Sequence, residues 1–228
     1  MDPLQKPSSA LELWLQDVQS YIYKVTKGPM HHGNFKFDRN SFHYNRKSKN
    51  SQDELSIIFL SQFPVSYRIG FQLEIWHPEI RQIKESFMSD ILNRESFLCS
   101  IILFMKDFPS QEAPDEIMKD FTVCTHRDLF LAGAWLAQTL QYELVPLCDQ
   151  MSSIKHMDDF FQARPQWSLS TRSGGNLCTD LITAKLNKKR DYHQRYQELR
   201  QAVRLEIESR SLNPEVCRLL DLCYESIR

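Results

Sequence analysis

Residues 53–77 read DELSIIFLSQFPVSYRIGFQLEIWH. In the second half of this stretch, apolar side chains occupy every other position, and the positions between them are polar or glycine. The apolar positions are Tyr67, Ile69, Phe71, Leu73 and Ile75. Such alternation is typical of a β-strand with one buried and one solvated face. The first half, residues 55–63, is richer in apolar residues on both faces, and Pro64-Val65 follows where a turn would reverse the chain. We therefore expect two antiparallel strands at the centre of a sheet.

The composition is that of an ordinary globular chain. Of 228 residues, 42% are hydrophobic and 25% are charged, which allows a sizeable core without disulfides or metals. The formal net charge is −1, so no field of the whole molecule attracts nucleic acid or membranes. No apolar run approaches the ~18 residues of a membrane helix, and the N-terminus lacks the pattern of a signal peptide. We expect a cytoplasmic protein without a cofactor or a membrane partner.

Six cysteines are scattered through the chain without a C-x-x-C pair. They are Cys99, Cys124, Cys148, Cys178, Cys217 and Cys223. Most of them lie within apolar stretches, so buried free thiols in a reducing compartment are the expected state. A disulfide framework is the alternative interpretation.

The segments before the central strands predict a helix and a hairpin. Ser9 and Glu12 fit a capping box that starts a helix, and Gly28-Pro29 should end it. Asn40-Ser41 lies between residues that would form a hairpin packed on the central strands. Residues 45–52 are polar and indicate an exposed loop.

The segments after the central strands predict five further elements of a mixed fold. Pro78 suits the first position of a helix. Residues 97–105 favour a buried strand, although a continued helix also fits, and residues 121–124 indicate a short strand beyond the acidic loop 109–120. Thr125 should cap a helix that is apolar on most sides and that Pro146 kinks or ends. A short helix is expected over residues 154–161.

The chain is therefore predicted to be an α+β protein with a mainly antiparallel sheet, covering helices and an all-helical C-terminal part. Residues 164–175 read RPQWSLSTRSGG, a composition typical of a linker. We expect a sheet domain over residues 1–163, this linker, and a helical subdomain over residues 176–228.

No complete catalytic pattern is present in the sequence. Cys124 and His126 would point the same way on a strand, as a nucleophile and its base do, but no orienting group or oxyanion site can be identified. His31, His32 and His43 could approach one another in the hairpin and hold a metal, although polar loop histidines are more often solvated. A hydrolase or metal enzyme using these residues is a remaining alternative.

Two stretches concentrate positive charge. Residues 31–50 contain five cations, interleaved with aromatic residues, and one acidic residue, Asp38. Residues 185–204 contain seven cations and two acidic residues, Asp191 and Glu198. The candidate partner-binding residues are Lys36, Arg39, Phe42, Tyr44, Arg46, Lys47 and Lys49. The alternative basic face comprises Lys185, Lys188, Lys189, Arg190 and Arg195. Such patches fit a protein partner with an acidic surface, and nucleic acid is the alternative partner.

Several segments within residues 10–161 follow a pattern of spacing. The pattern includes Phe42 and Arg46 in a hairpin, the strand pair of residues 56–75, and LVPLCD at residues 144–149 followed by a serine-led helix at Ser153. It resembles a bacterial family of uncharacterised α+β proteins, of the domain-of-unknown-function type, with members that look associated with immunity or defence. This chain has Leu147 and Cys148 where that family has aromatic residues.

The resemblance implies no enzyme activity and no catalytic residues. The function expected from the sequence is a non-enzymatic protein-binding module in a bacterial cytosol. It would be an immunity or defence component or a subunit of a larger complex, and a nucleic-acid-associated accessory subunit is the alternative.

Overall fold

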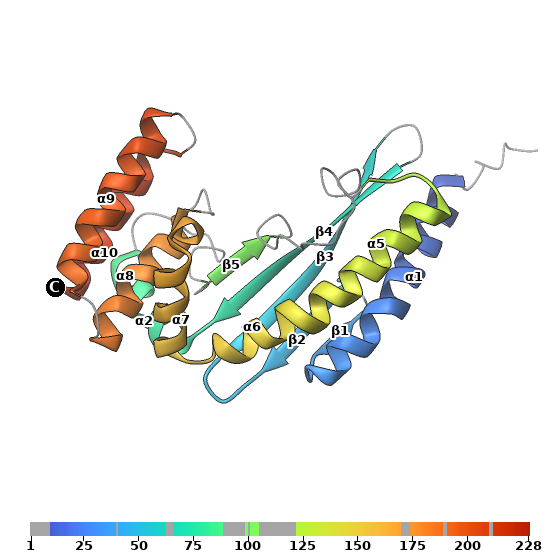
Figure 1. The fold of residues 1–228 in the computed structure, drawn as a ribbon, viewed down its shortest axis with the longest axis horizontal. Coiled ribbons are helices and arrows are strands. Elements are labelled where there is room, and N and C mark those ends of the chain that lie inside the picture. The colour runs from blue at the N-terminus through green and yellow to red at the C-terminus, as the bar shows by residue number, and fades with distance from the viewer. Residues whose placement is uncertain are drawn as a thin grey trace, which may run out of the picture.

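A computed structural model describes residues 10–39, 41–62, 66–88, 99, 101–104, 122–169, 174–188, 191–209 and 212–228. The chain has an α+β fold, as the sequence predicts. An antiparallel sheet carries α1 and α5 along one face, and helices of the C-terminal part gather beside α2 at the other end of the molecule (Figure 1). None of the helices in these ranges is long and apolar enough to cross a membrane.

The two central strands form as predicted. Strands β3 (Gln52–Gln62) and β4 (Ser66–Trp76) pair antiparallel over their whole length. Leu55 lies opposite Leu73 and Ile57 lies opposite Phe71, and all four side chains are buried. The alternating pattern thus identified the buried face correctly, while Pro64 and its turn lie outside the described residues.

Four shorter strands complete the sheet. In the order β1-β2-β3-β4-β5, β1 (Lys36–Asp38) lies at one edge and β2 (His43–Lys47) follows it. Both β5 (Ile101–Phe104) and β6 (Thr122–Val123) pair with β4, β5 near its end and β6 near its start. The predicted hairpin and both predicted strands in these regions are confirmed for the residues described. The acidic loop 109–120 lies outside them.

Helix α1 (Ala10–His32) is longer than predicted, because Gly28 and Pro29 do not end it. The chain leaves the helix at Asn34, which adopts a left-handed backbone conformation with φ of 61°. The backbone N–H of Phe35 then donates to the carbonyl of Met30. An αL residue just beyond the last turn is a common helix terminus, and the backbone bonds made there satisfy carbonyls of the last helical turn. The predicted cap Ser9 lies outside the described residues.

The second covering helix consists of three consecutive parts. They are α5 (His126–Thr139), the π-helical turn η2 (Leu140–Leu144) and α6 (Val145–Gln150). Thr125 and Asp128 form the capping box at its start, as predicted. Pro146 has no N–H to continue the α-helical pattern, and the widened turn lies directly before it. A Cβ on Gly133 would lie 2.6 Å from the Tyr21 ring, so this glycine permits close packing of α5 on α1.

The C-terminal part is helical, and α8 (Gly175–Asn187) lies at its centre, buried from Gly175 to Ala184. The surrounding elements are α2 (Pro78–Met88), α7 (Ile154–Ala163), α9 (Tyr192–Glu208) and α10 (Glu215–Ile227). The predicted linker is not simply an exposed connection. Its residues Pro165–Leu169 form a short 3-10 helix in which Trp167 and Ser168 are buried.

Two buried polar side chains join the helical part to the sheet region. The ammonium group of Lys84 on α2 donates to the carbonyls of Cys99 and Gly175, at 2.6 and 3.0 Å. The amide of Asn176 accepts from the N–H of Ile102 and donates to its carbonyl, which extends the β5 edge as a neighbouring strand would. The separation into two domains stays a prediction, but these bonds show that the two parts are directly connected.

Candidate functional site

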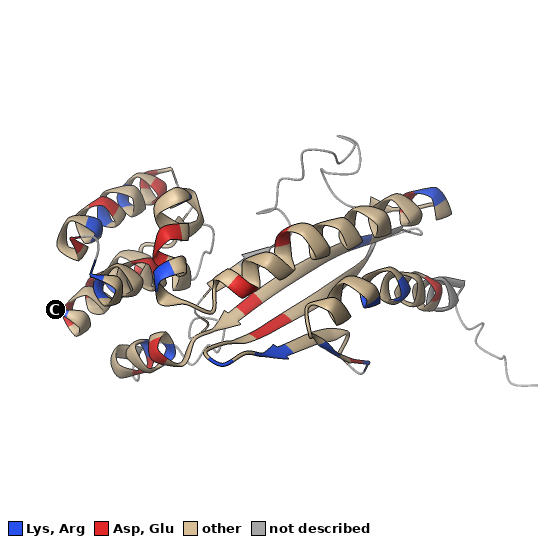
Figure 2. Cartoon of the chain, turned by 60° about the horizontal axis from the view of Figure 1, so that its bottom comes forward, with Lys and Arg blue, Asp and Glu red and all other residues tan. Residues whose placement is uncertain are grey.

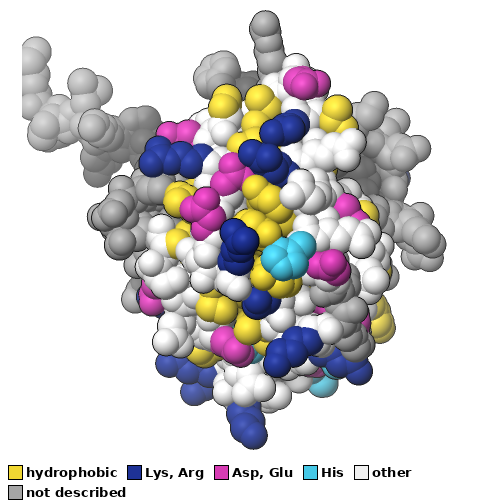
Figure 3. Space-filling model, turned by 90° about the vertical axis from the view of Figure 1, so that its left-hand side faces the viewer, with side chains coloured by type: hydrophobic (Ala, Val, Ile, Leu, Met, Phe, Trp, Pro, Cys, Tyr) yellow, Lys and Arg dark blue, Asp and Glu magenta, His cyan; other side chains and the backbone are white. Residues whose placement is uncertain are grey.

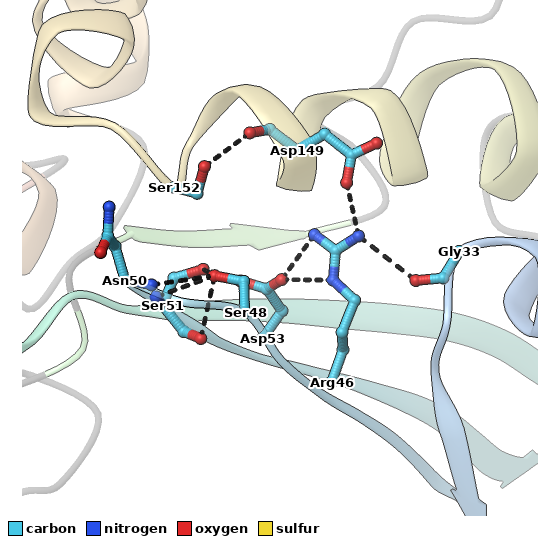
Figure 4. A network of polar contacts seen from close by, with 8 residues as sticks. All are labelled: Gly33, Arg46, Ser48, Asn50, Ser51, Asp53, Asp149 and Ser152. Atoms are coloured by element: carbon cyan, nitrogen blue, oxygen red, sulfur yellow. Dashed lines mark hydrogen bonds and ion pairs between the residues drawn. The ribbon is translucent and has the colours of Figure 1, made fainter.

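An ion-pair cluster around the buried Arg46 holds the second strand, the third strand and the second covering helix together. The guanidinium of Arg46 on β2 donates through Nε to Asp53 on β3 at 2.8 Å and through one terminal nitrogen to Asp149 on α6 at 2.6 Å. The same nitrogen reaches the carbonyl of Gly33 at 3.3 Å (Figure 4). Arg46 is 8% exposed and Asp53 is fully buried, and Ser51 donates to the second oxygen of that carboxylate.

Local sequence explains how these groups meet. Arg46 lies two residues after Tyr44, so both side chains point to the helix-covered face of the sheet, and Asp53 lies directly opposite Arg46 in the strand pairing. Gly33 packs against Val145 so closely that a Cβ would lie 2.8 Å from it, which brings α6 down beside the strand. Asp149 of α6 then lies within hydrogen-bond distance of the Arg46 guanidinium.

The electrostatics of the cluster are those of a structural pair. Burial raises the pKa of Asp53, and the adjacent Arg46 guanidinium offsets only part of that rise. Burial alone would lower the pKa of Arg46, but Asp53 and Asp149 outweigh it and raise that pKa. Cys148 beside them is fully buried, and burial raises its pKa well above the usual value, so it is no ready nucleophile.

The expectation that Arg46 lies on an exposed loop is therefore wrong. Residues His43–Lys47 are a strand. Arg46 is buried and pairs with Asp53 and Asp149 of the same chain, so it is not available to a partner. Phe42 and Tyr44 also belong to the scaffold. Phe42 packs edge-on against Phe59, and the Tyr44 hydroxyl bonds to Thr26 at 2.7 Å.

The other predicted cations of this segment are exposed, and the fold adds one more to them. We define the basic edge as the exposed cations around strand β1, namely Lys27, Lys36, Arg39, Lys47 and Lys49. Lys27 on α1 lies over the ring of Tyr23, which in turn stacks on Phe37 of β1. Figure 2 shows the blue positions on β1, β2 and the following turn along one border of the sheet. None of these five forms an ion pair within the described residues.

The alternative basic face is less available than its sequence indicates. Arg195 is largely buried, and it donates through Nε to Asp180 at 3.2 Å and through a terminal nitrogen to Glu198 at 2.9 Å. Lys185 lies over the ring of Tyr192 at 4.0 Å, and Lys188 is exposed, while Lys189 and Arg190 lie outside the described residues. On the face formed by the C-terminal helices, cations alternate with acids and apolar groups (Figure 3).

The candidate catalytic and metal-binding residues do not assemble into a site within the described ranges. Cys124 and His126 are exposed, and Asp128 accepts hydrogen bonds from backbone N–H groups at the helix cap, which leaves it in a capping role. His32 bonds the carbonyl of Gly28, and His43 pairs with Glu54 at 2.9 Å. No group of three or more His, Cys, Asp or Glu side chains in the described part could hold a metal ion.

Sequence reasoning missed the role of Arg46, although a signal for it was present. Tyr44 and Arg46 continue a period-two pattern, and Asp53 and Leu55 begin another, so an arginine and an aspartate share the buried face of neighbouring strands. Comparisons with protein families, with curated proteins and with solved structures found nothing that matches this chain.

Proposed function

We propose that this protein is a non-enzymatic binding module whose basic edge receives an acidic surface of a protein partner. One observation carries the proposal. Five exposed cations from α1, β1, β2 and their adjoining turns surround the edge strand of the sheet without an ion pair among the described residues. The fold adds Lys27 of α1 to this set, because Tyr23 on the same helix stacks on Phe37 of β1.

The charges of the basic edge contribute little to the stability of the chain itself. Exposed charges are solvated and screened, so their energetic effect on folding is small. A partner of opposite charge gains from them in association rate and in specificity, because long-range attraction steers the encounter and discriminates against cationic surfaces. The arrangement is therefore explained better by binding than by folding.

The scaffold under the basic edge orders the backbone from which these cations project. Phe37 stacks on Tyr23 with ring centroids 4.5 Å apart, and its edge meets Phe42 at 5.1 Å. The buried Arg46 cluster ties β2, which carries Lys47, to β3 and α6. A surface whose backbone is already ordered loses less conformational entropy on binding, which favours affinity.

A protein partner fits these observations better than nucleic acid does. Arg46 and Arg195, two of the cations counted for the sequence-based hypothesis, satisfy internal carboxylates instead. The formal net charge of the chain is −1, so it lacks the general positive field that non-specific nucleic-acid binding uses. A role in bacterial defence or in a larger complex remains part of the proposal, supported by the family resemblance alone.

The first test is capture of the partner from cells that contain this protein, with the wild-type chain as bait and a nuclease added in a parallel arm. The proposal predicts a protein that is retained at low ionic strength, released as salt is raised, and retained after nuclease digestion. Loss of the captured material on nuclease digestion would support nucleic acid instead. Capture that withstands high salt would contradict a contact made by the basic edge.

A further inference from the structure

Strand β1 is the first strand of the sheet, and its outer side carries no further strand within the described part of the chain. Among these residues β1 pairs with β2 and with no other strand. The outer side of an edge strand offers backbone N–H and C=O groups to which another strand can add. The cations of the basic edge surround this strand, so a partner that binds them also meets its backbone.

The hydrogen bonds around β2 determine which backbone groups of β1 point outward. The N–H of Ile57 donates to the carbonyl of Phe42, so this carbonyl points toward β3. Because the C=O and N–H of a trans peptide unit point in opposite directions, the N–H of His43 points toward β1. His43 lies opposite Asp38, which makes these two a hydrogen-bonded pair. Bonded and non-bonded pairs alternate, so the N–H and C=O of Phe37 point away from β2, to the outer side.

Positive charge flanks this position on both faces of the sheet. Phe37 packs on Tyr23 of α1, so the side chain of the neighbouring Lys36 points to the opposite face, where it is exposed. Lys27 lies over the Tyr23 ring on the helix-covered face. A strand that adds beside Phe37 would therefore meet a cation on each face of the sheet.

We propose that the partner contributes an extended acidic segment, which adds to β1 as a new edge strand. This inference rests on the proposed function, because it specifies how the basic edge holds its acidic partner. A second copy of β1 does not fit this place, since pairing two such edges would bring Lys36 and its neighbours against the same cations. The charges that repel a second basic edge attract an acidic strand. In strand addition the main-chain bonds give affinity and the side chains give specificity.

The charges of β1 also determine the order of residues in the added segment. In an antiparallel arrangement one residue of the segment exchanges both bonds with Phe37, the residue before it lies opposite Asp38, and the residue after it lies opposite Lys36. Like charges directly opposite each other are unfavourable, so a neutral residue suits the first position and a carboxylate the last. The middle side chain lies beside the Phe37 ring, where an apolar group suits. The expected order is neutral, apolar, acidic.

The peptide acetyl-Thr-Ser-Val-Glu-Val-Glu-amide carries this order and serves as the probe for the full-length chain. Amide hydrogen exchange, followed residue by residue by NMR, tests the backbone contact. In the free protein the Phe37 amide should exchange faster than those of Lys36 and Asp38, which point toward β2. Saturating peptide should slow the exchange of Phe37 by about tenfold or more, because its N–H then has an acceptor.

Two comparisons separate backbone pairing from simple charge attraction. A version of the peptide that is methylated at every backbone nitrogen keeps its carboxylates and loses its donors, so it should bind about tenfold more weakly. Lys36→Gln should also weaken the unmodified peptide. Lys188→Gln, at an exposed position of the helical part, is the matched control and should leave its affinity unchanged.

The possible failures of this inference and of the proposed function are distinct. Equal affinities for the two peptides, with unchanged exchange of Phe37, would overturn strand addition and leave an acidic partner at the basic edge. A probe that does not bind would overturn the inference alone, because capture of the partner tests the proposed function separately. A captured partner that is indifferent to reversal of Lys36, Lys47 and Lys49 would overturn the proposed function, and strand addition with it.

Discussion

The buried ammonium group of Lys84 should make the stability of this protein depend on pH in a defined window. The side chain is fully buried, and its two described acceptors are the carbonyls of Cys99 and Gly175. Burial lowers the pKa of Lys84 from 10.5 to about 8, although the nearby thiols oppose part of that shift. The perturbation that isolates this effect is Lys84→Met, which keeps the length of the side chain and removes its charge.

Whether stability rises or falls with pH follows from the direction of the Lys84 pKa shift. Between about pH 8 and pH 10.5 the unfolded chain holds a proton on Lys84 that the folded chain has released, so stability rises with pH. Below this window the folded protein carries the full cost of a buried charge. The shift corresponds to about 3 kcal/mol, of which about 2 kcal/mol should be recovered between about pH 7 and about pH 9.5.

Urea unfolding of the two proteins at several pH values measures the effect. The titrations of the cysteines and tyrosines are common to both chains and cancel in the difference between their free energies of unfolding. That difference should move in favour of the wild type by about 2 kcal/mol over the stated range. Lys155→Met, at an exposed position of α7, is the control and should show no such trend. A flat difference for Lys84→Met would refute the reasoning, because it would mean that the ammonium group remains hydrated or compensated in the folded state.

Two further predictions concern the core. Arg46→Ala should lower the free energy of unfolding by about 3–5 kcal/mol, because it leaves the buried carboxylate of Asp53 without its cation. Lys47→Ala, at the exposed neighbouring position, should change it by less than about 0.5 kcal/mol, and similar values for the two would contradict the buried pair. Phe71→Ala should cost about 3–5 kcal/mol, since it empties a position packed against Trp135. Arg68→Ala, on the opposite face of β4, should cost less, and the reverse order in denaturant melts would show that the register is wrong.

The elements that sequence predicted well are those whose signal is local. The alternation from Tyr67 to Ile75 identified both the strand and its buried face, because a period of two has one structural solution when one face is covered. The capping box of Thr125 and Asp128 likewise needs only residues that are neighbours in sequence. The exposure of Lys47 and Lys49 was predicted for the same reason, since the polar stretch around the turn after β2 carries its own signal.

The elements that sequence mispredicted depend on distant partners. Arg46 looks like a loop cation until Asp149, which is 103 residues away, comes to lie beside it. Trp167 lies among linker-like residues, but it packs against Phe160, and Ser168 donates to the buried Asp180. The end of α1 is an exception with a local cause: Gly28-Pro29 was expected to end the helix, which instead ends where Asn34 adopts a left-handed conformation. Lys27 lies beside the hairpin cations because Tyr23, on the same helix, stacks on Phe37 of β1.

The affinity of the purified partner for charge-reversed chains tests the central claim most directly. The test variant changes Lys36, Lys47 and Lys49 to Glu on the basic edge. The matched control changes Lys188, Arg204 and Arg218 to Glu, three exposed cations of the helical part. Isothermal titration calorimetry should show binding at least tenfold weaker for the test variant, about 1.4 kcal/mol, with both melting temperatures nearly unchanged. Equal affinities for the test variant and the wild type, or a larger loss in the control, would contradict binding at the basic edge.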